Sequence, residues 1–201
     1  MITCKQYRVD SKAALAGNWG MAIGLALIFS VLTGVIAAIP IANIILVGAL
    51  AVGYCYAQIM LFRRGKFLFS DLFTAFDDRF PATIGLFIEE AIFIFLWSLL
   101  FVIPGIVAAY RYAMAPYILA DHPEMSGIDC IRASKKLMTG KKGKLFLLDL
   151  SFIGWILLSI LTFGILLLWI GPWMEAARAN FYESIKGELA AEVQPAAPVA
   201  E

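Results

Sequence analysis

The sequence is poor in charge and in the residue types on which most enzyme chemistry depends. Only 15% of its 201 residues are charged, one is histidine and three are cysteine. It contains no GxSxG, HExxH, Walker or CxxC motif, and its one histidine, His122, stands in a polar DHPEM turn. The sequence therefore favours a protein with no enzymatic activity, no cofactor and no metal site, and nothing in it points to nucleic-acid binding.

What the sequence has in quantity is apolar residues. They make up 62% of the chain, and the mean hydropathy of +0.85 lies outside the range of soluble domains. The positive and negative residues nearly cancel, leaving a net charge of +1, so the total charge gives no reason to expect a polyanionic partner. This composition indicates an all-α integral membrane protein whose main partner is the lipid bilayer.

Six apolar runs are long enough to span a bilayer, which takes about 20 residues per helix. They lie at about residues 20–39, 41–62, 82–103, 105–120, 145–161 and 163–182. We expect a bundle of six transmembrane helices in three hairpins over residues 1–186. The remainder, 187–201, is small, acidic and proline-bearing, and is expected to be a disordered cytoplasmic tail.

The placement of basic residues predicts the orientation in the membrane. The turns near Pro40, Pro104 and Thr162 contain no Lys or Arg. Most of the basic residues lie in the segments between the hairpins and at the two ends, which are 1–18, 63–81, 121–144 and 183–201. Under the positive-inside rule, both termini and the two long loops face the cytoplasm. Cys4 and Cys130 would then face a reducing compartment, so no disulfide is expected.

Each hairpin follows a short segment with the pattern of an amphipathic helix at the membrane interface. We expect one such helix to be capped by Ser70, and another to begin after Ser126 and stop at Gly140. The first and third segments share a spacing, because SKAALAGNWG and SKKLMTGKKG both read Ser-Lys, four residues, Gly, two residues, Gly. Together with the regular spacing of the outer turns, this favours a tripled helical hairpin.

Small residues four apart predict close contacts between helices. Gly20 and Gly24 lie in the first run, and Ala49, Gly53 and Ala57 in the second. This spacing lets helix backbones approach each other closely. We expect the first two spans to pack together, and the same residues could form the seam of a homo-oligomer.

Several ionisable side chains lie inside the predicted spans, where the hydrocarbon core makes a charge unfavourable unless another group pairs with it. Counting 1.5 Å of rise per residue from the outer turns places Glu90, Asp149 and Glu175 at one depth, roughly 20 Å into a core about 30 Å thick. Further ionisable or hydroxyl-bearing residues within these spans complete a predicted polar layer: Glu89, Arg111, Tyr117 and Arg178.

Residues of this kind should face the bundle interior or a wet cavity open to the cytoplasm. Four carboxylates against two arginines leave an excess of acid. The layer could be a salt-bridge network that fixes helix packing, a cation or proton site used in transport, or side chains extending to the cytoplasmic interface. Arg111 lies higher, at about 10 Å, so pairing it with Glu90 would require helix tilt, a bend at Pro116 or bridging water.

A basic cluster precedes the fifth run. It consists of Arg132, Lys135, Lys136, Lys141, Lys142 and Lys144. Anionic lipid headgroups attract such clusters by about 1 kcal/mol per charge, so headgroup contact is one expectation. The other is that the cluster acts only as a topology signal.

The segment YILADHPEMS, followed by SKKLMTGKKGKLFLLDLSFIGWILLSILTFGILLLWIGPW, resembles a bacterial family of integral membrane proteins known as domain of unknown function 975. RRGKFLFSDLFTAF, the VIPGI turn and FYESI extend the resemblance over nearly the whole chain except the tail. The resemblance implies a six-helix protein of the bacterial cytoplasmic membrane, similar in layout to the membrane region attached to some glycerophosphodiester phosphodiesterases. It implies no activity. The positions within the shared motifs include Arg111, Tyr112, Asp149, Ser151, Gly154, Trp155, Phe181 and Tyr182.

Three functions remain open from the sequence. The leading hypothesis is a non-enzymatic scaffold, assembly factor or partner subunit of the bacterial envelope, which would bind another membrane protein. The second is a small transporter or channel in which Glu89, Glu90, Asp149 and Glu175 bind a cation or proton. The third, a lipid-processing enzyme, has only the similarity of layout behind it.

Overall fold

The computed structural model describes residues 3–36, 40–76, 80–100 and 102–187. These residues form helices and turns, and no β-strand occurs among them. In chain order the helices are α1 (Cys4–Leu15), α2 (Trp19–Ile36), α3 (Pro40–Arg64), the 3-10 helix η1 (Phe69–Phe76), α4 (Phe80–Leu100), α5 (Val102–Tyr112), α6 (Ala115–Asp121), α7 (Gly127–Leu137), α8 (Lys142–Leu150), α9 (Ile153–Leu161) and α10 (Leu167–Ile185). The predicted all-α class is confirmed. Of the predicted tail, residues 188–201 lie outside the described residues.

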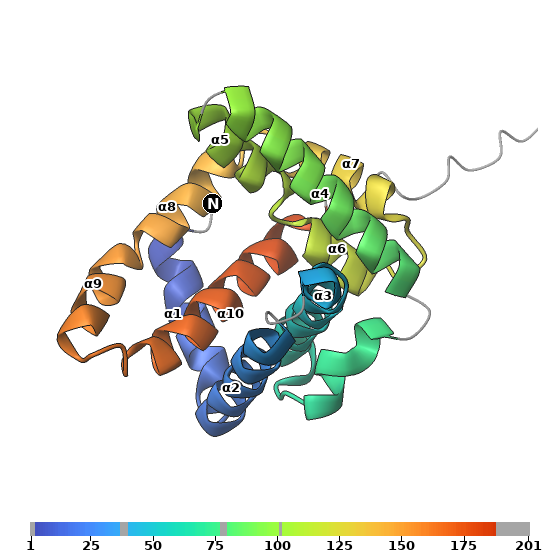
Figure 1. Ribbon diagram of the computed structural model, residues 1–201. Coiled ribbons are helices and arrows are strands. Elements are labelled where there is room, and N and C mark those ends of the chain that lie inside the picture. The colour runs from blue at the N-terminus through green and yellow to red at the C-terminus, as the bar shows by residue number, and fades with distance from the viewer. Residues whose placement is uncertain (1–2, 37–39, 77–79, 101, 188–201) are drawn as a thin grey trace, which may run out of the picture.

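Helix α3 is the centre of the assembly. It packs against α2, η1, α4, α6 and α10, and Figure 1 shows it nearly end-on with the other helices around it. Ala49, Val52, Ala57 and Ile59 on this helix are fully buried. Helices from every part of the chain therefore share one core along α3.

Three helical stretches among the described residues are long and apolar enough to cross a membrane. They are Trp19–Ile36, Leu46–Arg64 and Lys142–Leu161, which fall in the first, second and fifth predicted runs. The third and sixth predicted runs are largely helical as α4 and α10. The described part of the chain is thus all-helical, with three helical stretches suited to a membrane.

The fourth predicted run, 105–120, is not one helix. It forms α5 and α6, with a turn at residues 113–114 between them. Pro116 lies at the start of α6. Because proline lacks the N–H of a continuous helix and its ring crowds the preceding turn, the chain breaks there.

The fifth predicted run, 145–161, is also divided, into α8 and α9, by a turn at Ser151 and Phe152. The Ser151 hydroxyl donates to the backbone carbonyl of Leu148 at 2.6 Å, and a guanidinium N–H of Arg8 donates to the Ser151 carbonyl at 2.9 Å. These bonds engage backbone groups that an uninterrupted helix would use.

The predicted boundaries of the third amphipathic segment are confirmed. The Ser126 hydroxyl accepts a hydrogen bond from the Asp129 N–H at 3.3 Å, and α7 begins at the next residue, Gly127. Past the end of α7, Gly140 has a φ of +75°, a left-handed conformation that suits glycine.

The prediction for the second segment is wrong. Ser70 does not cap an α-helix, because residues Phe69–Phe76 form the 3-10 helix η1 and Ser70 lies inside it. The carboxylate of Asp71 instead accepts a hydrogen bond from the Leu68 N–H at 3.2 Å. Asp71 is itself buried, so this segment packs into the protein rather than lying free at an interface.

The close backbone approach predicted at Gly53 is confirmed, but its partner is η1. A Cβ added at Gly53 would overlap the backbone carbonyl of Leu72. Helix α2 also packs against α3, although Gly24 of α2 faces the ring of Phe69 rather than α3. The helix α3 that carries Ala49, Gly53 and Ala57 therefore packs against both η1 and α2.

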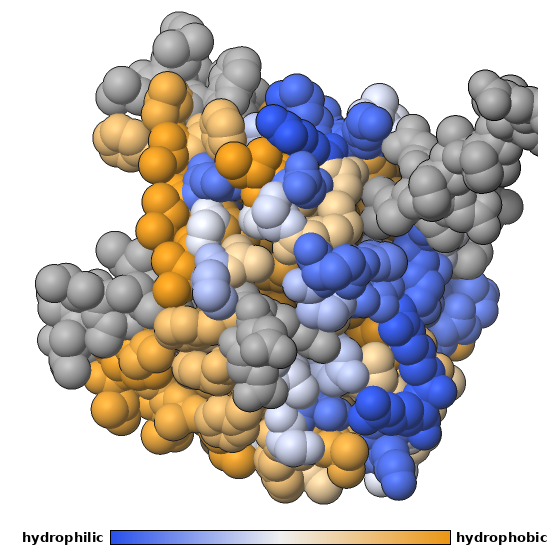
Figure 2. Space-filling model, turned by 90° about the vertical axis from the view of Figure 1, so that its right-hand side faces the viewer, coloured by the Kyte–Doolittle hydropathy of each residue, from blue (hydrophilic) through white to orange (hydrophobic). Residues whose placement is uncertain are grey.

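On the face drawn in Figure 2, polar and apolar residues gather in different areas. Figure 2 shows hydrophilic residues gathered along one side of the view and hydrophobic residues along the opposite side. Large apolar side chains are exposed on α2 and around the α9–α10 turn, where Phe163 is 98% exposed. Such surfaces are typical of contact with lipid or with another membrane protein.

Replacing Gly53 by alanine should destabilise the protein. The new methyl group would overlap backbone, which cannot swing aside as a side chain can, and overpacking of this kind typically costs about 1–3 kcal/mol. Gly20→Ala is the matched control, because nothing lies within 4 Å of a Cβ at that helical position. We expect Gly53→Ala to lower the melting temperature of the detergent-purified protein and Gly20→Ala to leave it unchanged or raise it. Equal melting temperatures for the two variants would contradict the packing described here.

Candidate functional site

One arginine on α10 holds two carboxylates inside the bundle. The Nε and one terminal nitrogen of Arg178 bind the two carboxylate oxygens of Asp149 on α8, at 3.0 and 3.1 Å. The other terminal nitrogen binds Glu175, one turn earlier on α10, at 3.2 Å. The Asp149 contact is bidentate, the geometry in which a guanidinium pairs most strongly with a carboxylate.

Two tyrosines complete this group. The Tyr110 hydroxyl of α5 donates to Asp149 at 3.0 Å, and the Tyr117 hydroxyl of α6 donates to Glu175 at 3.1 Å. Every carboxylate oxygen of Asp149 and Glu175 thus accepts a bond. We call these five residues, Tyr110, Tyr117, Asp149, Glu175 and Arg178, the Arg178 cluster.

The Arg178 cluster borders two cavities. The first, about 400 Å³, lies between α3, α5, α6, α8 and α10 and is lined by all five cluster residues. The second, about 420 Å³, lies between α2, α3 and α10. Cys55 and Glu175 line both cavities, so these two side chains stand between them.

The structure brings together part of the predicted polar layer. Asp149, Glu175, Arg178 and Tyr117 meet in the Arg178 cluster, and Tyr110, which was not among the predicted residues, joins them. Glu175 and Arg178 form an ion pair across one turn of α10.

The other three predicted residues make no hydrogen bond or ion pair with this cluster in the described part of the chain. Among the described residues, Glu90 makes no ion pair or hydrogen bond, and the guanidinium of Arg111 makes none either, so the two do not pair. Glu89 has a buried carboxylate oxygen without a hydrogen-bond partner in the described part of the chain. The charges that act on Glu89 are those of Arg132 and Asp129 on α7, which places it toward another side of the bundle.

The predicted basic cluster lies on the end of α7 and the start of α8. Arg132, Lys135 and Lys136 are exposed, whereas Lys141, Lys142 and Lys144 are partly buried. Lys142 borders an apolar hollow of about 390 Å³ between α5 and α8, beside Phe146. The arrangement therefore sets positive charge directly beside apolar surface.

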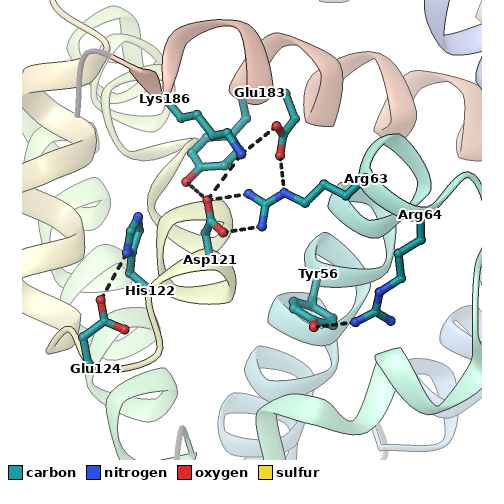
Figure 3. A network of polar contacts seen from close by, with 9 residues as sticks. Tyr56, Arg63, Arg64, Asp121, His122, Glu124, Glu183 and Lys186 are labelled. Carbon is teal, nitrogen blue, oxygen red and sulfur yellow. Dashed lines mark hydrogen bonds and ion pairs between the residues drawn. The ribbon is translucent and has the colours of Figure 1, made fainter. Parts of the chain in front are cut away.

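A second charged network, absent from the sequence predictions, joins α3, α6 and the end of α10. Its centre is Asp121, whose two carboxylate oxygens each lie 2.7 Å from a terminal nitrogen of Arg63 (Figure 3). The Nε of Arg63 lies 3.0 Å from Glu183, which also pairs with Lys186 at 2.7 Å. The Tyr182 hydroxyl donates to Asp121 at 3.1 Å. These five residues form the Asp121 network.

The Asp121 network unites segments that the resemblance had singled out separately. Arg63 opens RRGKFLF, Asp121 closes YILAD, and Tyr182 and Glu183 belong to FYESI. The shared motifs were thus the one sequence signal that could have pointed to this network.

The surroundings of Asp121 favour its charged form. Burial by itself would raise the pKa of Asp121, but the hydrogen bonds and charge of Arg63, with Lys186 and Tyr182 adding to them, hold this pKa below its ordinary value. The network therefore stabilises the folded protein while Asp121 is ionised.

Comparison with known proteins gives one family. Residues 89–188 match the family model described as Protein of unknown function (DUF975), which confirms the predicted resemblance over this part of the chain. The match contains the whole Arg178 cluster and all of the Asp121 network except Arg63. Neither the curated proteins nor the solved structures contain a match to the chain.

Asp121 should make stability depend on pH. A carboxylate whose pKa is depressed by folding contributes stability that is complete above its unfolded value, about 3.9, and is lost as the pH falls through the folded value. We expect Asp121→Asn to melt below wild type at pH 7, and the difference to shrink as the pH is lowered past 4. The measurement is the melting temperature of both proteins from pH 7 to pH 3.

Asp10→Asn is the control, because the Asp10 carboxylate accepts its hydrogen bond from Gln6 of the same helix. This variant should follow wild type at every pH. A gap between wild type and Asp121→Asn that stays constant down to pH 3 would show that the ionised carboxylate is not what stabilises the network.

Proposed function

We propose that this chain is a non-enzymatic integral membrane protein of the bacterial cytoplasmic membrane that acts as a scaffold, assembly factor or partner subunit. In this proposal the chain crosses the membrane six times in three hairpins, with both termini in the cytoplasm. Its partner would be another membrane protein or a second copy of the chain.

The observation that carries the proposal is the complete pairing within the Arg178 cluster. All four oxygens of Asp149 and Glu175 accept bonds from Arg178, Tyr110 or Tyr117. These residues come from α5, α6, α8 and α10, so the cluster braces four helices against one another. A fully satisfied buried polar network fixes a single packing arrangement, which is what a rigid partner subunit requires.

The distribution of charge supports the proposed orientation. The Asp121 network and the basic cluster contain ten of the charged residues and lie at the ends of helices that would face the cytoplasm. The exposed apolar residues of α2 and α9 would meet lipid. Ion pairs at the cytoplasmic ends would then hold the hairpins together where water can solvate the remaining charge.

A cation- or proton-coupled transporter is the second candidate, and one observation favours it. The two acids of the Arg178 cluster exceed its single arginine by one negative charge, and Glu175 stands between two cavities. A carboxylate between two hollows is where an ion could pass from one to the other. A substitution of Glu175 therefore tests which of the two candidate functions is correct.

The proposed topology predicts which positions are reached from each side. In a cysteine-free background, Phe163→Cys in the α9–α10 turn should react with a membrane-impermeant maleimide added to intact cells. Thr139→Cys, in the turn after α7, should react only in inside-out vesicles. Both parent side chains are exposed, so burial does not limit either reaction. Labelling of both positions from the same side would overturn the proposed topology.

Glu175→Gln distinguishes a scaffold from a transporter. We expect the purified chain in liposomes to move no more protons, sodium or potassium than empty liposomes. The variant should melt earlier, because the charged acceptor for Arg178 and Tyr117 is lost, a change worth about 1.5–3 kcal/mol. The measurements are dye-reported ion flux and melting temperature.

The control for this comparison is Glu124→Gln, which changes a highly exposed carboxylate by the same chemistry. It should alter neither readout. Ion flux in wild type that disappears in Glu175→Gln but persists in Glu124→Gln would replace the scaffold proposal by the transporter.

A further inference from the structure

Four of the five tryptophans of the chain line one cavity. Trp19 of α2, Trp155 of α9, and Trp169 and Trp173 of α10 surround a space of about 550 Å³. Leu166 and Ile170 add apolar surface, and Lys12 of α1 is the charged residue on the wall. This cavity is separate from the two that border the Arg178 cluster, since it shares no lining residue with them.

One wall of the cavity is fixed by its own contacts. The indole N–H of Trp173 donates to the backbone carbonyl of Arg8 at 2.9 Å. Its ring meets Phe152 and Trp155 edge-on, with centroids 5.1 and 5.6 Å away. Trp173 is thus held in place on three sides, and its remaining face is available to the cavity.

Two other tryptophans of the wall are partly exposed to the surroundings. Trp155 is 41% exposed and Trp169 is 44% exposed. Helix α9 packs chiefly against α10, and the ribbon places it at the edge of the molecule (Figure 1). A ligand could therefore enter sideways from the bilayer, between α9 and the N-terminal helices.

Positive charge marks one end of the cavity. The ammonium of Lys12 lies 5.9 Å from the centroid of the Trp173 ring. On the same face of α1, one turn earlier, the guanidinium of Arg8 lies 6.0 Å from the Phe152 ring. Lys5, Arg8 and Lys12 share one face of α1, and Lys12 is the one of the three that lines the cavity.

We infer that this cavity binds a single phospholipid with an anionic headgroup. The phosphate lies at Lys12, and an acyl chain runs along Trp155 and Trp169. A cationic ligand is disfavoured, because Lys12 already occupies the charged end. An uncharged lipid would fill the apolar wall but leave the Lys12 ammonium without an anionic partner. The inference rests on the membrane location proposed above and adds a ligand to it.

Tryptophan fluorescence tests the site directly. The full chain is placed in phosphatidylcholine vesicles that contain a small, fixed fraction of lipid with brominated chains, either phosphatidylglycerol or phosphatidylcholine. Bromine quenches the indoles that it contacts. We expect stronger quenching by the brominated phosphatidylglycerol, and we expect Trp155→Phe with Trp169→Phe to remove most of this excess.

Charge-matched variants identify the headgroup contact. Lys12→Gln should weaken the preference for phosphatidylglycerol about fivefold, the factor that corresponds to one cation beside an anionic headgroup. Lys66→Gln, which removes an equally exposed lysine outside the cavity, should leave the preference intact.

Equal quenching by the two brominated lipids in wild type, or equal losses in Lys12→Gln and Lys66→Gln, would overturn the site. These results would leave the proposed membrane protein in place. Absence of quenching by either lipid would overturn both proposals, because the tryptophans would then not lie in a bilayer at all.

Discussion

The arrangement of the helices depends on neutralising Arg178 inside an apolar bundle. The Arg178 side chain is partly buried, and withdrawing a guanidinium from water is costly unless well-placed carboxylates offset the loss. Asp149 from α8 and Glu175 from α10 provide them. The two carboxylates then need donors of their own, which Tyr110 and Tyr117 supply. Each of these bonds ties α5, α6 or α8 to the cluster on α10. The need to pair the charges therefore limits how these helices can pack.

The depth of an ionisable side chain along its helix could be predicted from the sequence. The neighbouring helix that the side chain faces could not. Counting residues from the turn near Thr162 brought Asp149 and Glu175 to one level, because both lie on helices that flank that turn. Glu90 has the same calculated depth yet makes no bond to them, since a count of residues does not say which neighbour a helix face meets. Tyr110 was missed for a related reason. The break between α5 and α6 changes the path of the predicted fourth span, and a count of residues along one continuous helix does not include this change.

The shared motifs contain most members of the Asp121 network, but the sequence does not show that these members pair with one another, because they are distant in the chain. Arg63, Asp121 and Glu183 each stand near the end of a helix, where a charged residue is expected to be solvated and needs no special partner. Only the fold shows that these ends converge. The capping signals were different. Ser126 and Gly140 act on groups within a few residues, so local sequence was sufficient to predict them.

The two copies of the Ser-Lys segment show which features depend on nearby residues and which depend on contacts with distant parts of the chain. Gly17 and Gly140 both adopt a positive φ, and Ser11 and Ser134 are both fully buried, so the two copies agree in local structure. Their partners differ. Ser11 donates to Tyr7 within α1, whereas Ser134 of α7 donates to the Arg111 carbonyl of α5.

The asymmetry of the two copies follows from where α1 docks. Helix α1 packs against α8 and α10, and Figure 1 shows α1 and α10 side by side. The Tyr7 hydroxyl lies 2.8 Å from that of Ser184, which ties the first helix to the last. An N-terminal segment with the pattern of a free interfacial helix is therefore a closing element of the bundle. Because its binding surface is made by residues near the other end of the chain, α1 can reach its final position only after α10 has been synthesised.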